Sequence, residues 1–150
     1  MTKNTEKSNK TNLDLIDEDE ICREVMLEHL SLWEDLDWNE YNLKEKLEKN
    51  PYHYQQFRML WLGQKNKLRK IEMMRDEYVG NLYDKLKYEG DKTLTKTEIE
   101  KYYLPKDPQV MKFNRLCLRQ EIRTGVYEEI ANTFKMQGFA MGNYVKAMQI

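Results

Sequence analysis

The side chains most able to do chemistry in this chain are cations gathered in its middle. The stretch QKNKLRKIEMMR, residues 64–75, holds five Lys and Arg side chains against a single acid, Glu72. Successive residues on a helix advance by about 100°, so Arg58, Lys65 and Arg69 fall within about 40° of one another. A stripe of this kind has the positive charge to hold a phosphate backbone.

A solvated helix face is the plainer interpretation of the same charges. Such faces usually interleave opposite charges four residues apart, whereas six cations between Arg58 and Arg75 are balanced by Glu72 alone. Grooves for single-stranded nucleic acid combine cations for the phosphates with rings for the bases. Four rings lie nearby in the sequence: Tyr54, Phe57, Trp61 and Tyr78. Rings at helical spacing also serve as core residues, so both interpretations stay open.

Residues for catalysis or metal binding form no recognisable set. His29 and His53 are the only histidines and neither lies in an HExxH pattern, while both common Gly-rich phosphate loops are absent. The acids of Asp17–Glu20 point around a helix axis and suit a helix N-terminus better than a metal ion. Cys22 and Cys117 match no metal or redox spacing and indicate free thiols in a reducing compartment. We therefore expect no enzyme, no metal and no cofactor.

The charge is divided unevenly along the 150 residues. Residues 1–50 carry a net charge of −7 and residues 51–150 carry +6, although the whole chain has only −1. An acidic arm of this kind can compete with an anionic ligand for a basic surface. No segment resembles a signal peptide or approaches the roughly 20 apolar residues that span a bilayer. We expect no membrane partner and a cytoplasmic location, in the host-cell cytoplasm if the chain is viral.

The pattern of apolar residues predicts an all-α fold with a long central helix, shorter N-terminal helices and a second long C-terminal helix. No sustained alternation or hairpin signal predicts a strand. The predicted organisation is a flexible polar tail at 1–16 and one helical domain at 17–150. Within that domain we expect acidic N-terminal helices at 17–49, a long basic helix at 51–88 and C-terminal helices at 95–150.

Local signals predict where the helices begin and end. Asn50-Pro51 predicts the start of the long helix, because Asn caps and Pro fits the first turn. Before it, WEDLDW predicts a bend and residues 41–48 a short helix. Gly90 predicts a left-handed stop, Thr95–Glu98 a capping box and Asp107-Pro108 a further start. Gly138 predicts the end of that last helix.

Surplus apolar residues predict self-association. Met59, Leu62 and Met73 lie within about 60° of one another, away from the main apolar face of the long helix. A monomer rarely exposes several large apolar side chains so close together. The helix that begins at Pro108 is apolar around most of its circumference, which is typical of a buried helix. We therefore expect a homo-oligomer in which the C-terminal helices take part.

The chain resembles the UvsY-type recombination mediators of tailed phages from about Leu30 to Ile150. The similarity is strongest in three segments: NPYHYQQF, TKTEIEKYYLPKDPQVMKFN and MQGFAMGNYVKAMQI. The segment WEDLDW is a weaker echo of the family's tryptophan-and-acid segment. These are similarities of pattern, and their specificity comes from their number and order.

The resemblance implies a helical, non-enzymatic protein that forms a ring-shaped homo-oligomer and binds single-stranded DNA. It implies displacement of the phage single-strand-binding protein and loading of the phage recombinase, in recombination, repair and recombination-dependent replication. The family's Lys/Arg-containing tetrapeptide is replaced here by Val79–Leu82, so no cation carries over at that place. The predicted nucleic-acid-binding residues are therefore other cations: Arg58, Lys65, Lys67, Arg69, Lys70, Lys85 and Lys87.

An adaptor protein is the alternative from another functional class. Its long helix would pair with another protein, and its basic residues would only face the solvent.

Overall fold

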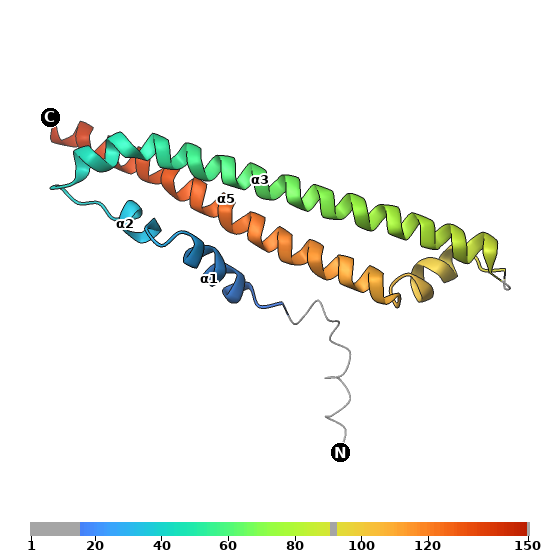
Figure 1. The fold of residues 1–150 in the computed structure, drawn as a ribbon. Coiled ribbons are helices and arrows are strands. Elements are labelled where there is room, and N and C mark those ends of the chain that lie inside the picture. Colours follow the sequence, from blue (N-terminus) through green and yellow to red (C-terminus); the bar gives the residue numbers. More distant parts are fainter. Residues whose placement is uncertain (1–15, 91–92, 150) are drawn as a thin grey trace, which may run out of the picture. The chain divides into compact units, whose positions relative to one another are not determined.

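The computed structural model describes residues 16–90 and 93–149, and every regular element in these ranges is a helix (Figure 1). The elements are α1 (Glu18–Glu28), α2 (Leu32–Leu36), α3 (Leu43–Asp84), the π-helical turn η2 (Lys85–Glu89), α4 (Lys96–Glu98), the π-helical turn η3 (Ile99–Tyr103) and α5 (Pro108–Met148). The all-α class, the long central helix and the long C-terminal helix are confirmed. The predicted tail at 1–16 lies, except for its last residue, outside the described residues. No helix of the described part is long and apolar enough to cross a membrane.

The described chain falls into two compact units, and α3 and α5 each contribute to both. One unit comprises Glu18–Asn66 with Glu121–Ile150 and the other contains Lys67–Gln120. The first has nine Lys and Arg against fourteen Asp and Glu, a net charge of −5, and is called the acidic unit below. The segment Lys67–Gln120 has thirteen against nine, a net charge of +4, and is called the basic unit. The single domain predicted for 17–150 stays a prediction.

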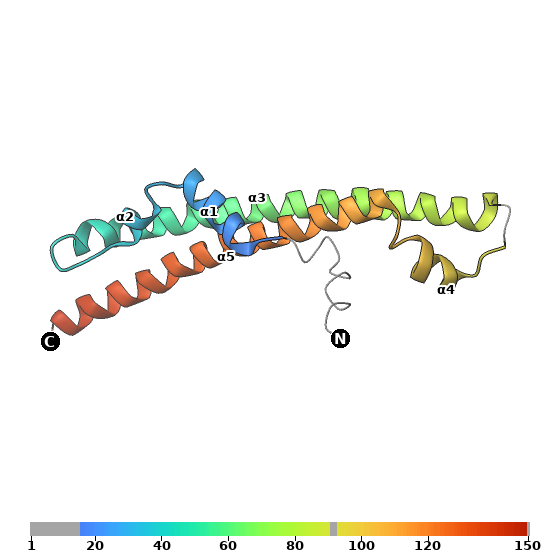
Figure 2. The same cartoon turned by 90° about the horizontal axis from the view of Figure 1, so that it is seen from below.

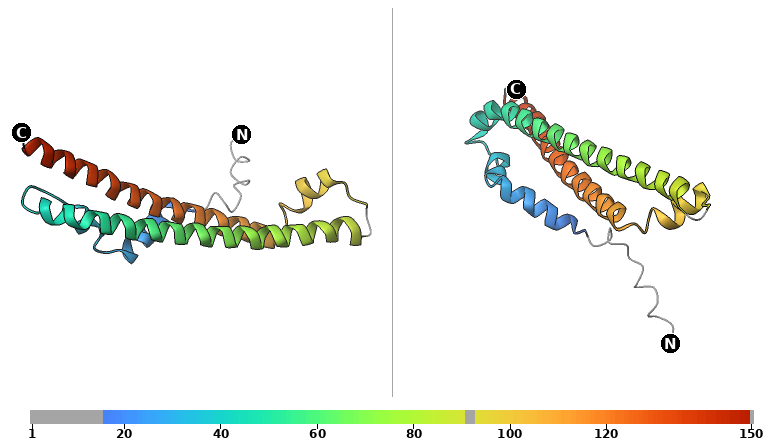
Figure 3. Two further views of the ribbon diagram at one scale, coloured as in Figure 1. Left: turned by 90° about the horizontal axis from the view of Figure 1, so that it is seen from above. Right: turned by 45° about the vertical axis from the view of Figure 1, so that its right-hand side comes forward.

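Aromatic packing forms the core of the acidic unit. In this unit α3 and α5 run in opposite directions, and α1 and α2 pack against them (Figure 3). The rings of Phe57 and Phe134 stack with centroids 5.4 Å apart, and His29 meets Phe57 edge-on at 5.1 Å. The buried cluster comprises Val25, Leu32, Phe57, Val126, Tyr127, Ile130, Ala131 and Phe134. All four helices of the unit thus share one core.

Polar contacts join α1 to the two long helices of the acidic unit. Arg123 on α5 donates to the carboxylate of Glu28 at 2.5 Å and to the side-chain oxygen of Gln64 at 3.2 Å. The hydroxyl of Tyr127 donates to the same Glu28 carboxylate at 3.1 Å. The hydrogen bond from Arg123 lowers the pKa of Glu28, and burial raises the pKa of Tyr127 to about 12. Glu28 therefore stays ionised and Tyr127 neutral at pH 7.

The last residue of α2 and the connection after it are held against α5. The side-chain amide of Gln137 donates to the backbone carbonyl of Leu36 at 2.7 Å, and the hydroxyl of Tyr144 donates to Glu40 at 2.5 Å. The bend predicted for WEDLDW is wrong for its first residues, because α2 includes them and buries Leu32 in the core. Within WEDLDW, the helix ends at Leu36 and Asp37 is extended.

The helix start predicted at Asn50-Pro51 is wrong. The helix α3 begins at Leu43 and continues through Pro51, so the separate short helix expected at 41–48 is its first part. Asn50 is buried, and its side-chain amide donates to the backbone carbonyl of Phe134 at 2.8 Å. Asn50 therefore serves a contact between two helices instead of a cap.

The helix end predicted at Gly138 is also wrong, because α5 continues to Met148. A Cβ atom at Gly138 would lie 2.5 Å from Oδ1 of Asn50. Real Cβ atoms do not approach this closely, so only glycine lets α5 lie against the buried amide. The sequence predicts that Asn50 begins a helix and that Gly138 ends one. The two residues instead contact each other where α3 packs against α5.

The helix caps of the basic unit agree better with the sequence predictions than the helix ends of the acidic unit do. The hydroxyl of Thr95 accepts from the backbone N–H of Glu98 at 3.2 Å, and Oδ1 of Asp107 accepts from the N–H groups of Gln109 and Val110 at 2.9 and 3.0 Å. The cap by Asp107 is confirmed, and so is the Thr95 half of the predicted capping box. The predicted left-handed stop is wrong, since Gly90 has φ −81° and ψ 154° and is extended.

The core of the basic unit lies beside these caps. Figure 2 shows α4 and η3 between the end of α3 and the start of α5 along the chain. Ile99, Val110 and Cys117 are buried. The hydroxyl of Tyr78 on α3 donates to Asp107 at 3.0 Å, and its ring lies 5.8 Å from that of Phe113. The same carboxylate therefore caps α5 and anchors α3.

We expect Gly138→Ala to destabilise the chain by about 1–3 kcal/mol, because the new methyl group overpacks Asn50. Gly142→Ala is the matched control on the same helix, since its Cβ would meet nothing within 4 Å. The control should stabilise by about 0.5–1 kcal/mol, as glycine is a poor helix former. In an Asn50→Ala background, Gly138→Ala should lose most of its cost. Urea unfolding of the four variants measures these differences, and equal costs in both backgrounds would contradict the contact.

Candidate nucleic-acid interface

The seven predicted cations all lie on α3 and on the π-helical turn that follows it. Arg58 and Lys65 belong to the acidic unit. The other five belong to the basic unit: Lys67, Arg69, Lys70, Lys85 and Lys87. Six of the seven are exposed, and Lys87 is half-buried. Five of the seven thus lie in the unit with a net positive charge.

None of the seven forms an ion pair with another residue in the described part of the chain. Other cations are paired: Lys49 lies 2.6 Å from Glu45 on the same helix, and Arg123 holds Glu28. The neighbour Arg75 contacts Asp76 at 3.2 Å. The stripe therefore differs from a face that neutralises itself through i,i+4 pairs, and its charges are available to an anion.

The four rings near the stripe belong to the interior and not to a stacking platform. Phe57 is buried, while Tyr54 and Trp61 pack against the core of the acidic unit. Tyr78 is half-buried in the basic unit, where Asp107 accepts its hydroxyl. The ammonium of Lys65 lies 4.7 Å from the centroid of the Trp61 ring, close enough for a cation–π contact. The core interpretation thus holds for these rings.

The apolar residues predicted to seek a partner are exposed. Met59, Leu62 and Met73 are 59%, 39% and 64% exposed, and Met74 beside them is 58% exposed. The helix α5 is not enclosed by this chain alone, since Phe139 is 58% exposed. Both long helices therefore offer apolar side chains on their surfaces.

The two histidines are engaged in packing. His29 lies edge-on to Phe57 and Tyr127, with its Nε2 atom 3.0 Å from the hydroxyl of Tyr127. His53 stacks on Phe134 with centroids 5.2 Å apart. Among the residues that the structure places, no three His, Cys, Asp or Glu side chains are grouped to hold a metal ion. Glu18, Asp19 and Glu20 occupy the first turn of α1, as the sequence predicts.

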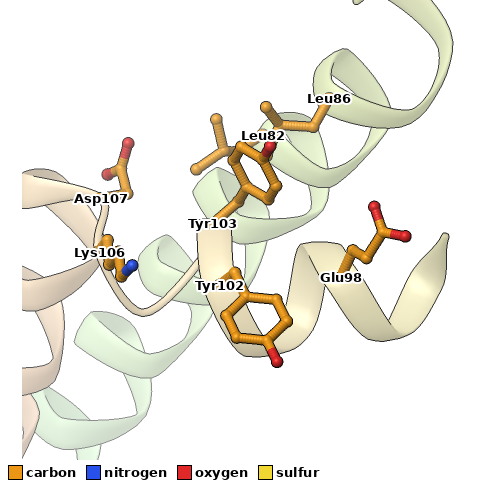
Figure 4. Close-up of a pocket in the computed structure, with 7 residues that line it drawn as sticks. All are labelled: Leu82, Leu86, Glu98, Tyr102, Tyr103, Lys106 and Asp107. Atoms are coloured by element: carbon orange, nitrogen blue, oxygen red, sulfur yellow. The ribbon is translucent and has the colours of Figure 1, made fainter. Parts of the chain in front are cut away.

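Sequence reasoning missed a second set of residues with the types needed to bind nucleic acid. In the basic unit, a pocket of about 610 Å³ opens beside η3, with Tyr102, Tyr103 and Lys106 in its lining (Figure 4). The sequence signal was the pair of adjacent tyrosines in KYYLPK. Neighbouring residues of a helix point in different directions, so one helical turn cannot bury both rings in the same core.

Comparison with protein-family models, curated proteins and solved structures finds no match to this chain.

Proposed function

We propose that this chain binds single-stranded DNA without sequence readout, through the exposed cations of α3 and η2. Lys and Arg side chains neutralise phosphates, and the release of condensed counterions drives binding whatever the base sequence. The observation that carries the proposal is the absence of ion pairs, within the described residues, for all seven cations. The net charge of +4 on the basic unit adds a favourable local field.

The biological role that we propose is that of a recombination mediator. The resemblance to UvsY-type proteins supports a role in displacing the single-strand-binding protein and loading the phage recombinase. That role belongs to recombination, repair and recombination-dependent replication in the host-cell cytoplasm. This role requires high total affinity for DNA built from individually weak contacts, so that a recombinase can displace the protein from the strand.

Self-association is part of the proposal. The exposed side chains of Met59, Leu62 and Met73 favour a second copy of the chain as their partner. A ring of identical subunits multiplies modest contacts with one strand, because each further contact is intramolecular. The net charge of −5 on the acidic unit makes such summation necessary, since one subunit both attracts and repels DNA.

An adaptor protein is the second candidate function. The same exposed methionines and leucine favour it, because Met-rich surfaces adapt to different protein partners. The two functions differ in one observable, since an adaptor would not bind single-stranded DNA at low salt beyond background.

We expect the double substitution Lys65→Glu with Arg69→Glu to weaken binding of a fluorescent oligo-dT several-fold, because two phosphate contacts become repulsions. Lys135→Glu with Lys146→Glu is the matched control, as it makes the same charge change at two exposed lysines of α5 that form no ion pair with another described residue. Fluorescence anisotropy at low salt measures both. Equal weakening by the two double variants would reject the stripe as the site.

We expect Leu62→Asn to reduce both assembly and DNA affinity, because it removes an exposed apolar contact without changing the charge. Leu30→Asn is the matched control, since Leu30 is 78% exposed and lies outside α3. Sedimentation velocity measures the mass, and anisotropy measures affinity for the same strand. A wild-type chain that sediments as a monomer at micromolar concentration would contradict self-association.

A further inference from the structure

The basic unit contains an open pocket at the end of α3, and the seven predicted cations do not account for it. Its volume is about 610 Å³, within the range of about 300–1,000 Å³ usual for ligand pockets. Its lining residues are Leu82, Leu86, Glu98, Tyr102, Tyr103, Lys106 and Asp107. They come from α3, η2, α4, η3 and the turn before α5, so the pocket lies within one compact unit.

Two tyrosine rings give the pocket flat apolar surfaces. Tyr102 is 58% exposed and Tyr103 is 41% exposed, although Ile99 on the same turn is fully buried. Figure 4 shows the ring of Tyr103 beside Leu82, while the ring of Tyr102 projects from the other side of η3. Tyr103 and Leu82 thus form an apolar side of the pocket, and the more exposed ring of Tyr102 leaves an aromatic face for a flat ligand.

The pocket also offers an unengaged positive charge. Lys106 has no ion-pair partner among the described residues, whereas Oδ1 of Asp107 already accepts from Tyr78, Gln109 and Val110. The lining holds two acids: Asp107, which is engaged in these hydrogen bonds, and Glu98, which Figure 4 places well apart from Lys106. Lys85 and Lys101 precede the lining residues Leu86 and Tyr102 in the sequence. Both lysines are exposed, and neither forms an ion pair with another described residue. A ligand that joins a flat ring to negative charge matches this combination.

We propose that this pocket receives a base of single-stranded DNA, with the more exposed ring of Tyr102 as its stacking surface and Lys106 at a neighbouring phosphate. The proposal rests on the proposed function and adds to it a site for bases beside the site for the backbone. Every base has a π-face, so stacking on tyrosine holds a strand without reading its sequence. A protein side chain without a negative charge is a weaker fit, because it would not use Lys106, the lysine of the pocket lining.

The test compares two strands of equal length and equal phosphate number, oligo-dT and an abasic strand built from tetrahydrofuran units. The full chain should bind oligo-dT at least about fivefold more tightly, because stacking on aromatic side chains adds to the phosphate contacts. Tyr102→Ala should remove most of this preference and leave affinity for the abasic strand unchanged. Tyr102→Phe should keep the preference, since it keeps the ring. Tyr41→Ala is the matched control, because Tyr41 is 99% exposed in the acidic unit.

The outcomes separate this proposal from the function on which it rests. Equal affinity of the full chain for both strands would overturn the base site and leave phosphate binding standing. Failure to bind either strand would overturn both. A Tyr102→Ala variant that keeps the preference, or that loses affinity for both strands alike, would also reject the base site. Photocrosslinking of a strand with 5-iododeoxyuridine gives an independent readout, and no crosslink to the peptide containing Tyr102 and Tyr103 would count against it.

Discussion

The packing of α3 against α5 through a small set of rings is the constraint on which the acidic unit depends. Phe57 stacks on Phe134 at 5.4 Å, and His53 stacks on the same Phe134 at 5.2 Å. Because these residues determine which face of α3 is buried, they also determine which face meets solvent. Arg58, next to Phe57, is exposed for this reason. The candidate interface is thus a consequence of core packing as well as of charge.

Charges are used differently in the two units. In the acidic unit, two cations join helices or connections: Arg123 holds Glu28 on α1, and Lys46 donates to the backbone carbonyl of Glu34. In the basic unit, two ion pairs between described residues are surface pairs: Arg75 lies 3.2 Å from Asp76, and Lys96 lies 3.9 Å from Glu100. A surplus that contributes little to the fold is more readily explained by a ligand.

The sequence predicts the helical class and the capped helix starts because both depend on local patterns. Thr95 and Asp107 form the hydrogen bonds that their positions predict. The helix start at Asn50 and the helix end at Gly138 are predicted wrongly because these residues contact each other, although they are 88 residues apart in the sequence. Local sequence patterns cannot predict such a contact. In both cases the tertiary contact outweighs the preference of a single residue for a helix end.

In the candidate site, too, the features that depend on local sequence could be predicted and those that depend on tertiary contacts could not. Exposure of Arg58, Lys65 and Arg69 follows from helical periodicity, and so does the burial of Phe57. The pocket beside η3 could not be predicted in this way, because it is formed by residues from α3 and from the turns near residues 98–107. Only the three-dimensional structure brings Leu82 and Leu86 to Tyr103.

The dependence of single-strand affinity on salt tests the central claim most directly, namely that unpaired cations hold a strand through its phosphates. The logarithm of the binding constant for oligo-dT should fall linearly with the logarithm of salt concentration. A slope of about −2 or steeper corresponds to at least about three phosphates neutralised, at roughly 0.7 per contact on a single strand. A slope near zero, or no binding at low salt, would contradict the account.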